Sequence, residues 1–181
     1  MAQVIHITHQ NSNTPLRLFL KFNHTNKGDK MNPINLKIVC DDAKYLPTYA
    51  NETDACMDLK VVVPNIKGRV ITPNQSKVFS TGIKVQIPEG YVMLVFPRSS
   101  TGYKLNCRLM NSTGVIDSGY RDEIKLMVHN FGELSQIIDD GQRIAQFMII
   151  PRPKINLEVV PDNEEFKSGN RGGGIGSTGK I

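Results

Sequence analysis

Short β-branched segments bounded by Pro, Gly, Asn or Asp dominate the sequence, and this pattern constrains the fold more than any other feature. No window of ten or more residues carries an apolar repeat of 3.6 residues, apart from a single helical turn near 99–105. The segments cover residues 36–40, 57–63, 77–87, 91–96, 123–130, 143–150 and 155–160. They predict an all-β sandwich or barrel-like fold, and pairing with a second subunit would protect its strand edges.

Length and charge indicate one domain without a membrane span. The chain has 181 residues, of which 39% are hydrophobic, so one core can form. The apolar stretch 16–22 is short and interrupted by charge, which predicts neither a membrane helix nor a signal peptide. We therefore expect a soluble, intracellular protein in the cytoplasm, with a nucleus or a host cell left open.

The net charge of +5 is concentrated at the beginning of the chain. Residues 1–30 hold four cations against Asp29 and so carry +3, which leaves +2 for the remainder. A surface-wide basic footprint is thus absent, and nucleic acid is not an expected partner. Any recognition of anions should be local.

Composition divides the chain into three regions. Residues 1–30 are predicted to be a disordered extension, residues 31–166 a β-domain, and residues 167–181 a flexible Gly-rich C-terminal arm. The three cysteines form no CxxC pair, and we interpret them as reduced structural residues.

The arm contains GIGSTGK at residues 174–180, which is close to a phosphate-binding P-loop. A P-loop needs Ser or Thr directly after the Lys to reach Mg²⁺, whereas Ile181 stands there, so a Walker-type NTPase is disfavoured. Two interpretations stay open. The arm is a flexible tail, or it is an anion cradle of backbone N–H groups flanked by Arg171, Ser177, Thr178 and Lys180.

Three stretches place polar side chains where a strand does not need them. In PRSSTGYK (97–104), the guanidinium of Arg98 and the hydroxyls of Ser99 and Ser100 suit phosphate oxygens, and the alternative is a capped polar turn. In DACMDLK (54–60), the carboxylate of Asp58 either faces water or serves a site. In DDGQRIAQ (139–146), which is also typical of the start of a hairpin, the candidate donors are Gln142, Arg143 and Gln146.

The stretch NSTGVIDSGYRDE (111–123) predicts a β-hairpin with a Ser-Gly turn. A carboxylate beside a water molecule can activate that water for attack on phosphorus, which makes Asp117 the candidate general base. The alternative is an ordinary turn Asp. Tyr120 is either a cross-strand packing aromatic or a ring laid against a sugar.

Taken in order, these stretches resemble a known family. The succession ACMDL, PRSSTGYK, NSTGVIDSGYRDE, GQRIAQ and RGGGIGSTG closely resembles the five ordered motifs of the homotrimeric dUTPases, over about residues 34–181. The resemblance implies a jelly-roll or β-clip fold, and a homotrimer with a swapped or closing C-terminal arm and active sites at its subunit interfaces. It implies a Mg²⁺-dependent enzyme that hydrolyses dUTP to dUMP and pyrophosphate, keeps uracil out of DNA and supplies dUMP for thymidylate synthesis.

The resemblance also assigns roles to residues. Asp117 takes the general-base position, Asp58 matches the Asp that helps hold Mg²⁺ through water, and Tyr120 would pack under the deoxyribose. The other implied substrate-binding residues are the phosphate contacts Arg98, Ser99, Ser100 and Gln146, the uracil-reading residues Asn111, Gly114, Val115 and Ile116, then Lys125, and the arm residues Arg171, Ile175, Ser177 and Thr178.

The chain departs from the family pattern in its arm. Ile175 stands where a Phe usually stacks on uracil, and Arg171 is one residue closer to the glycine pair, so looser arm closure is expected. Two other functions stay open: a related dCTP deaminase, or a regulatory binding protein with the dUTPase fold.

Overall fold

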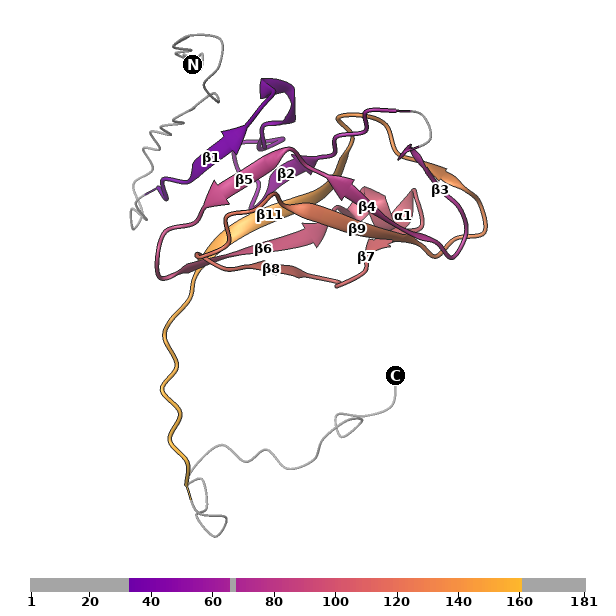
Figure 1. Ribbon diagram of the computed structural model, residues 1–181. Helices are drawn as coiled ribbons and strands as arrows, with labels where there is room; N and C mark the ends of the chain where they lie inside the picture. Colours follow the sequence, from indigo (N-terminus) through magenta and orange to yellow (C-terminus); the bar gives the residue numbers. More distant parts are fainter. Residues whose placement is uncertain (1–32, 66–67, 161–181) are drawn as a thin grey trace.

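Nearly all regular structure is β-strand in the computed structural model, which describes residues 33–65 and 68–160 (Figure 1). The strands are β1 (Lys37–Cys40), β2 (Met57–Lys60), β3 (Val70–Ile71), β4 (Ser76–Ser80), β5 (Ile83–Gln86), β6 (Tyr91–Pro97), β7 (Cys107–Leu109), β8 (Gly114–Ile116), β9 (Lys125–Asn130), β10 (Gln136–Ile137) and β11 (Arg143–Pro151). Within those ranges the helical segments are the 3₁₀ turn η1 (Ala43–Tyr45) and the helix α1 (Ser99–Tyr103). The all-β prediction is confirmed, and α1 is the expected helical turn.

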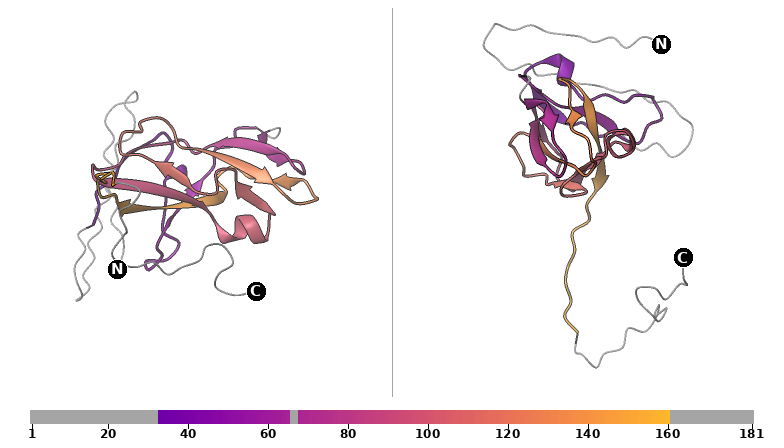
Figure 2. Two further views of the ribbon diagram at one scale, coloured as in Figure 1. Left: turned by 90° about the horizontal axis from the view of Figure 1, so that it is seen from below. Right: turned by 90° about the vertical axis from the view of Figure 1, so that its right-hand side faces the viewer.

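The strands form four antiparallel sheets in the described part of the chain. The largest has the order β2-β11-β6-β8, and a three-stranded sheet has the order β4-β9-β7. β1 pairs with β5, and β10 pairs with β3. Figures 1 and 2 show β4, β5 and β9 passing over β6, β8 and β11, so that the sheets enclose one interior. The long pair β6 and β11 lies at the centre of the sheet that carries the candidate site.

Alternating burial explains why these segments become strands. In β5 and β9 every second residue is buried, because successive side chains of a strand point to opposite faces. The buried side chains of the different sheets join one hydrophobic cluster, in which Leu59, Met93 and Ile144 have no exposed surface. Burying each large apolar side chain stabilises the fold by about 1.5–3 kcal/mol.

The single strand predicted over 77–87 is instead two strands, β4 and β5. Between them Gly82 has a φ of +69°, a conformation that favours glycine. The buried hydroxyl of Thr81 donates to the Ile124 carbonyl at 2.7 Å and fixes the bend. The chain therefore leaves one sheet and enters another at this point.

Two local predictions were wrong. Residues 111–123 do not form a hairpin, because β8 pairs with β6 and the residues after β8 form a turn. Residues 155–160 form no strand, although their apolar side chains alternate as in a strand. Ile155, Leu157 and Val159 are 77%, 90% and 96% exposed, since no other segment of the described chain lies against them.

Candidate active site

Asp58 on β2 is buried between two arginines. Its side chain is 6% exposed, and its Oδ1 lies 2.8 Å from Arg98 Nε. Its Oδ2 lies 3.0 Å from Arg143 Nη1. Arg98 follows the end of β6 and Arg143 begins β11, so neighbouring strands deliver both guanidinium groups. Burying a carboxylate is costly unless it is paired, so these arginines explain how an Asp can interrupt an apolar strand.

Backbone contacts fix the corner between β6 and α1. Thr101 is buried, and its Oγ1 donates to the Ile144 carbonyl at 2.7 Å. The backbone N–H of Arg98 donates to the same carbonyl at 3.2 Å. In addition, Arg98 Nη1 donates to the Arg143 carbonyl at 3.2 Å. The guanidinium of Arg98 is thus held at both a carboxylate and a carbonyl, which restricts its rotamers.

Gln146 on β11 lies in register with Asp58 on β2 and belongs to the same corner. Its Nε2 donates to the Pro97 carbonyl at 3.2 Å. Ser99 is exposed and Ser100 is half-buried in the first turn of α1. The sequence-predicted phosphate contacts are therefore brought together with Asp58.

An open pocket of ≈ 400 Å³ lies beside this corner. It is lined by Arg98, Ser100, Lys104, Leu105, Gly141, Gln142 and Arg143. Its lining thus includes three cationic side chains and no carboxylate, which suits a multiply charged anion. Lys104 was not assigned a role from the sequence, although its charge within PRSSTGYK was an available signal.

A smaller pocket of ≈ 40 Å³ gathers the sequence-predicted residues Asn111, Gly114, Ile116 and Lys125. A Cβ atom at Gly114 would lie 3.2 Å from the Cβ of Val95, so glycine lets β8 approach β6 closely. The rest of the lining is mainly apolar and comes from Val95, Leu109, Ile124, Leu126 and Met127. A mainly apolar pocket with a few polar side chains can hydrogen-bond to the edge of a flat ring.

The side chain of Val115 does not join this pocket. It is 62% exposed, because alternate residues of β8 point to opposite faces. Val115 therefore has only its backbone to offer a ligand there.

The turn after β8 carries Asp117 and Tyr120. The Tyr120 N–H donates to the Asp117 carbonyl at 3.0 Å, and Tyr120 Oη donates to the Glu123 carbonyl at 2.9 Å. The ring of Tyr120 is 37% exposed. The Asp117 carboxylate is exposed and has no hydrogen bond to another described residue.

One chain does not bring Asp117 and Arg98 together. β8 pairs with β6 in the register Met93↔Ile116, which carries Asp117 to the level of Val92. Arg98 lies six residues beyond Val92. At roughly 3.3 Å per residue, the two side chains are separated along β6 by roughly 20 Å. The candidate base and the cationic pocket thus lie at different ends of one sheet.

The donor set fits a magnesium ion only if the ligand supplies most of its coordination. The described residues contain no group of three or more His, Cys, Asp or Glu side chains that could hold a metal. Mg²⁺ usually keeps several waters and binds one or two carboxylates together with substrate phosphates. Asp58 lies beside the cationic pocket, but both of its oxygens are paired with arginines and its side chain is 6% exposed, so its part in holding Mg²⁺ through water stays a prediction.

The cysteines are free, as the sequence indicated. Cys40 and Cys107 are buried, and burial raises the pKa of both thiols. Burial, and then the charge of Asp58, raises the pKa of the Cys56 thiol. All three thiols are therefore protonated at neutral pH.

Some predictions lie outside the described residues. These are the extension 1–30 and the arm residues Arg171, Ile175, Ser177 and Thr178. Their roles stay predictions. In the part of the chain that is described, no helix has the length and apolar character needed to span a membrane.

The fold and the pocket define a class, namely an all-β protein with a cationic pocket beside a buried carboxylate. The family model for dUTPase matches residues 42–179. The chain is 37% identical over 147 residues to the deoxyuridine 5'-triphosphate nucleotidohydrolase of Clostridium tetani, covering 81% of this chain and 97% of that relative. It is 36% identical over 148 residues to the deoxyuridine 5'-triphosphate nucleotidohydrolase of Escherichia phage T5, covering 80% of this chain and 98% of that relative. The chain belongs to the dUTPase family.

Solved structures agree with this assignment. The dUTPase of Staphylococcus bacteriophage 80alpha with dUPNHPP has a TM-score of 0.68 and 29% identity, covering 80% of this chain and 98% of that one. The dUTPase of Streptococcus mutans has a TM-score of 0.58 and 27% identity, covering 65% of this chain and 93% of that one. The predicted jelly-roll or β-clip fold is confirmed.

Proposed function

We propose that this chain is a dUTP diphosphatase, which hydrolyses dUTP to dUMP and pyrophosphate. One observation carries the proposal. In a member of the dUTPase family, a pocket lined by three cations and no carboxylate lies beside the buried Asp58, where the phosphates of a nucleotide would be neutralised. In the cell this reaction would keep uracil out of DNA and supply dUMP for thymidylate synthesis.

In the proposed reaction, the carboxylate of Asp117 accepts a proton from a water molecule. The water oxygen forms a bond to the α-phosphorus, and the bond from the α-phosphorus to the oxygen that bridges to the β-phosphoryl group breaks, so that this oxygen leaves with pyrophosphate. The exposed carboxylate of Asp117 is free to orient a water. When bound, Mg²⁺ would add positive charge next to the phosphates, with Asp58 as its partner through water.

The positively charged corner would bind the phosphate chain. Arg98 presents its guanidinium from a fixed position, and Ser99, Ser100 and Gln146 add neutral donors nearby. Donors that are already oriented need little reorganisation when charge develops at phosphorus.

The smaller pocket would select the base. Asn111 and the backbone of residues 114–116 would read the edge of uracil, with Lys125 at the rim. An added methyl group is worth only roughly 1–3 kcal/mol to an apolar pocket, so excluding thymine needs a steric wall. The close approach of Gly114 to Val95 provides such a wall. Tyr120 would lie under the deoxyribose.

We further propose that the active protein is a homotrimer in which Asp117 of one subunit serves the cationic pocket of another. The separation of roughly 20 Å along β6 leaves the site incomplete in one chain. Apolar residues also stand unpartnered on two surfaces within the described chain. They are Ile155, Leu157 and Val159 after β11, and Val78 on β4 with Met110 directly after β7. A second copy of the chain would cover both.

The arm 167–181 would close over the bound triphosphate, and the extension 1–30 would take no part in the reaction. In this proposal Ser177 and Thr178 meet the γ-phosphate, Arg171 adds positive charge, and Ile175 covers the uracil less well than an aromatic ring.

The activity is tested by measuring pyrophosphate release from dUTP, dCTP, dTTP and UTP with Mg²⁺, for the wild-type chain and for Asp117→Asn. We expect turnover of dUTP alone, lost in the variant and in EDTA. Release of ammonia from dCTP would instead identify a deaminase. A folded chain that turns over none of the four nucleotides would point to a regulatory binding protein.

The oligomeric state is tested by sedimentation of the wild-type chain and of Leu157→Asp, with Lys154→Asp as the control. We expect a trimer that Leu157→Asp weakens, because a carboxylate would be buried against apolar side chains. A monomeric wild-type chain with full activity would contradict the shared site.

A further inference from the structure

The turn that precedes β11, with the first residue of β11, forms one wall of the cationic pocket through Gly141, Gln142 and Arg143. Backbone hydrogen bonds attach this turn to the segment after β2. Gly141 N donates to the Val61 carbonyl at 2.8 Å, and Val61 N donates to the Gln142 carbonyl at 3.1 Å. The backbone ladder does not continue to Val63, whose N–H donates instead to the carboxylate of Asp140 at 2.8 Å. A side chain thus replaces the next backbone hydrogen bond.

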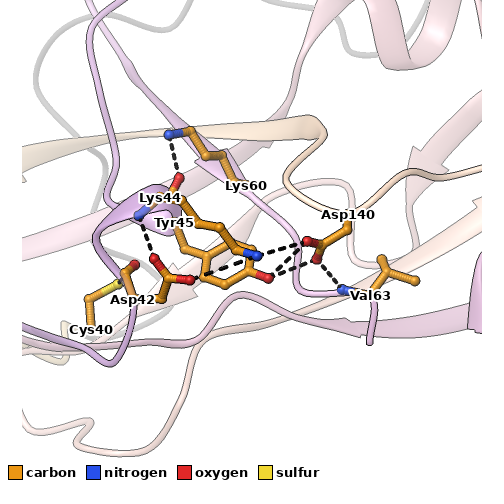
Figure 3. Close-up of polar contacts among 7 residues, drawn as sticks. All are labelled: Cys40, Asp42, Lys44, Tyr45, Lys60, Val63 and Asp140. Atoms are coloured by element: carbon orange, nitrogen blue, oxygen red, sulfur yellow. Dashed lines mark hydrogen bonds and ion pairs between the residues drawn. The ribbon is translucent and has the colours of Figure 1, made fainter. Parts of the chain in front are cut away.

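The same carboxylate is bound from the opposite side by the turn η1 (Figure 3). Tyr45 Oη donates to the carboxylate of Asp140 and lies 2.8 Å from its Oδ1 and 3.0 Å from its Oδ2. Lys44 Nζ donates to Oδ2 at 3.1 Å and lies 4.6 Å from the centre of the Tyr45 ring. Tyr45 is 8% exposed, so its hydroxyl is presented from a packed position. Asp140 therefore joins three parts of the chain.

The turn η1 is itself well anchored. Asp42 caps it by accepting from Lys44 N at 2.9 Å, and Lys60 Nζ donates to the Lys44 carbonyl at 2.7 Å. The hydrogen bond from Val63, followed by those from Tyr45 and Lys44, lowers the pKa of Asp140, so the carboxylate is ionised at neutral pH. The contacts with Tyr45 and Asp140 raise the pKa of Lys44.

The pocket wall needs such an anchor because its own backbone is irregular. Gly141 has a φ of +74°, and the register between β11 and β2 shifts between Arg143 and Ala145. A bulge of this kind re-aims the side chains beside it. Arg143 lies three residues after Asp140 and makes the contact with Asp58.

We propose that Asp140, held by Tyr45 and Lys44, is a positioning residue that fixes the 141–143 wall and thereby the affinity of the pocket for the terminal phosphates of the nucleotide. The inference rests on the proposed function, because it takes dUTP as the ligand. Asp140 does not touch the substrate. It acts through Arg143 and the backbone of the turn.

The test compares the affinities of the full chain for the imido analogue dUpNHpp and for dUMP, which lacks the two terminal phosphoryl groups. The variants are Asp140→Ala, Tyr45→Phe and Asp140→Asn. Asp139→Ala is the matched control, because Asp139 lies in the same turn but pairs with Arg69, which is not part of the pocket lining. Calorimetry gives the affinities, and circular dichroism verifies the fold, since the chain has no tryptophan.

We expect Asp140→Ala to weaken dUpNHpp binding on the order of tenfold, which is the equivalent of one lost charged hydrogen bond. Tyr45→Phe should weaken it less. Asp140→Asn should recover part of the affinity, because its amide oxygen can still accept from Val63. Binding of dUMP should be unchanged in each variant, and Asp139→Ala should behave as wild type with both ligands.

Unchanged dUpNHpp affinity in a folded Asp140→Ala chain would overturn the inference, as would an equal loss for both ligands. If Asp140→Ala does not fold, unchanged affinity in Tyr45→Phe, which lacks a single hydroxyl, overturns it. A wild-type chain that neither binds dUpNHpp nor hydrolyses dUTP would overturn the proposed function and this inference together. If the wild-type chain binds dUpNHpp and hydrolyses dUTP, while the variants bind dUpNHpp with unchanged affinity, the inference alone would be overturned.

Discussion

The corner around Asp58 and the turn around Asp117 differ in how completely one chain builds them. Asp58 is buried, and two arginines from neighbouring strands bind both of its oxygens. Asp117 is exposed, and the hydrogen bonds donated by Tyr120 next to it go to Asp117 and Glu123 of the same segment, whose end is held to Gly82 through Glu123. The corner proposed to bind phosphate is therefore organised by the fold of a single chain. The proposed catalytic residue lies at the surface, where the proposed neighbouring subunit could use it.

The difference matters for catalysis. Donors held by long-range contacts are oriented before the substrate arrives, and such preorganisation commonly contributes more than any other effect to the stabilisation of a transition state. A base on an exposed turn would gain its position only when another surface approaches. The proposed site would therefore combine a rigid binding corner with a base whose geometry depends on assembly.

The largest expected effect comes from mixing two inactive chains. Asp117→Asn alone should lose about 10²–10⁴-fold in kcat as a general base is removed. Arg98→Ala alone should lose about 10²–10³-fold as an oriented donor is removed. If the site is shared, trimers refolded from an equal mixture should recover about a quarter of wild-type activity, because each mixed trimer keeps one intact site.

The control for this experiment is the double variant Asp117→Asn/Arg98→Ala mixed with wild type. The double variant supplies neither Asp117 nor Arg98. In a trimer with shared sites, only a site formed between two wild-type chains therefore keeps both residues. If the two single variants recover no activity after refolding, although the mixed trimers are shown to form, both halves of the site must come from one chain. The proposed division between a binding corner and a base from another subunit would then be wrong.

The next largest effect is expected for Arg98→Lys, which keeps the charge but removes the guanidinium fork. Lysine cannot bind Asp58 through one nitrogen and the Arg143 carbonyl through another, as Arg98 does. We expect a loss of about 10²-fold in kcat/KM for dUTP. Lys104→Arg, in the same pocket, should change it far less, since the ammonium group of Lys104 makes no hydrogen bond to the corner within the described residues. Full kcat/KM in both variants in steady-state kinetics would show that charge alone matters.

A smaller effect is expected for Gly114→Ala, which tests the steric wall formed where Gly114 approaches Val95, between the corner and the turn on the β6-β8 pair. The new methyl group would lie 3.2 Å from the Cβ of Val95, closer than nine in ten such contacts. Overpacking of this kind costs about 1–3 kcal/mol. Thermal unfolding followed by circular dichroism should show a lower Tm, and dUMP should bind more weakly. Gly102→Ala, where a Cβ meets nothing within 4 Å, is the matched control.

The smallest expected effect is the pH dependence of the Asp140 anchor. Its pKa in the folded chain is below the ordinary value of 3.8, so the ionised carboxylate stabilises the fold. That stabilisation is complete above about pH 4 and is lost as the pH falls through the lower folded pKa. Since the side chain is 39% exposed, we expect it to be at most about 1 kcal/mol.

The measurement is the Tm of the wild-type chain and of Asp140→Asn between pH 7 and pH 3. The difference in Tm should be constant down to about pH 4 and should then shrink. A difference that grows as the pH falls would contradict the assigned direction of the pKa.

The sequence by itself determined the strand-rich fold and the family. Alternating apolar residues and turn-forming residues are local signals, so β6 and β11 were predicted almost to the residue, and α1 was expected as one turn. The ordered motifs around Arg98 and Asp117 identified the family for the same reason, since each motif is contiguous. The motif-derived role of Asp58 implied a metal partner, whereas its ion pairs with Arg98 and Arg143 were not foreseen.

Only the tertiary structure decided which distant residues meet. The contact of Tyr45 with Asp140 joins residues 95 positions apart, and no local pattern encodes it. The separation of Asp117 from Arg98 follows from the register of β8 on β6, which the predicted hairpin had missed. The segment 155–160 has the alternation of a strand but stays unpaired, because a strand requires a partner edge as well as a pattern.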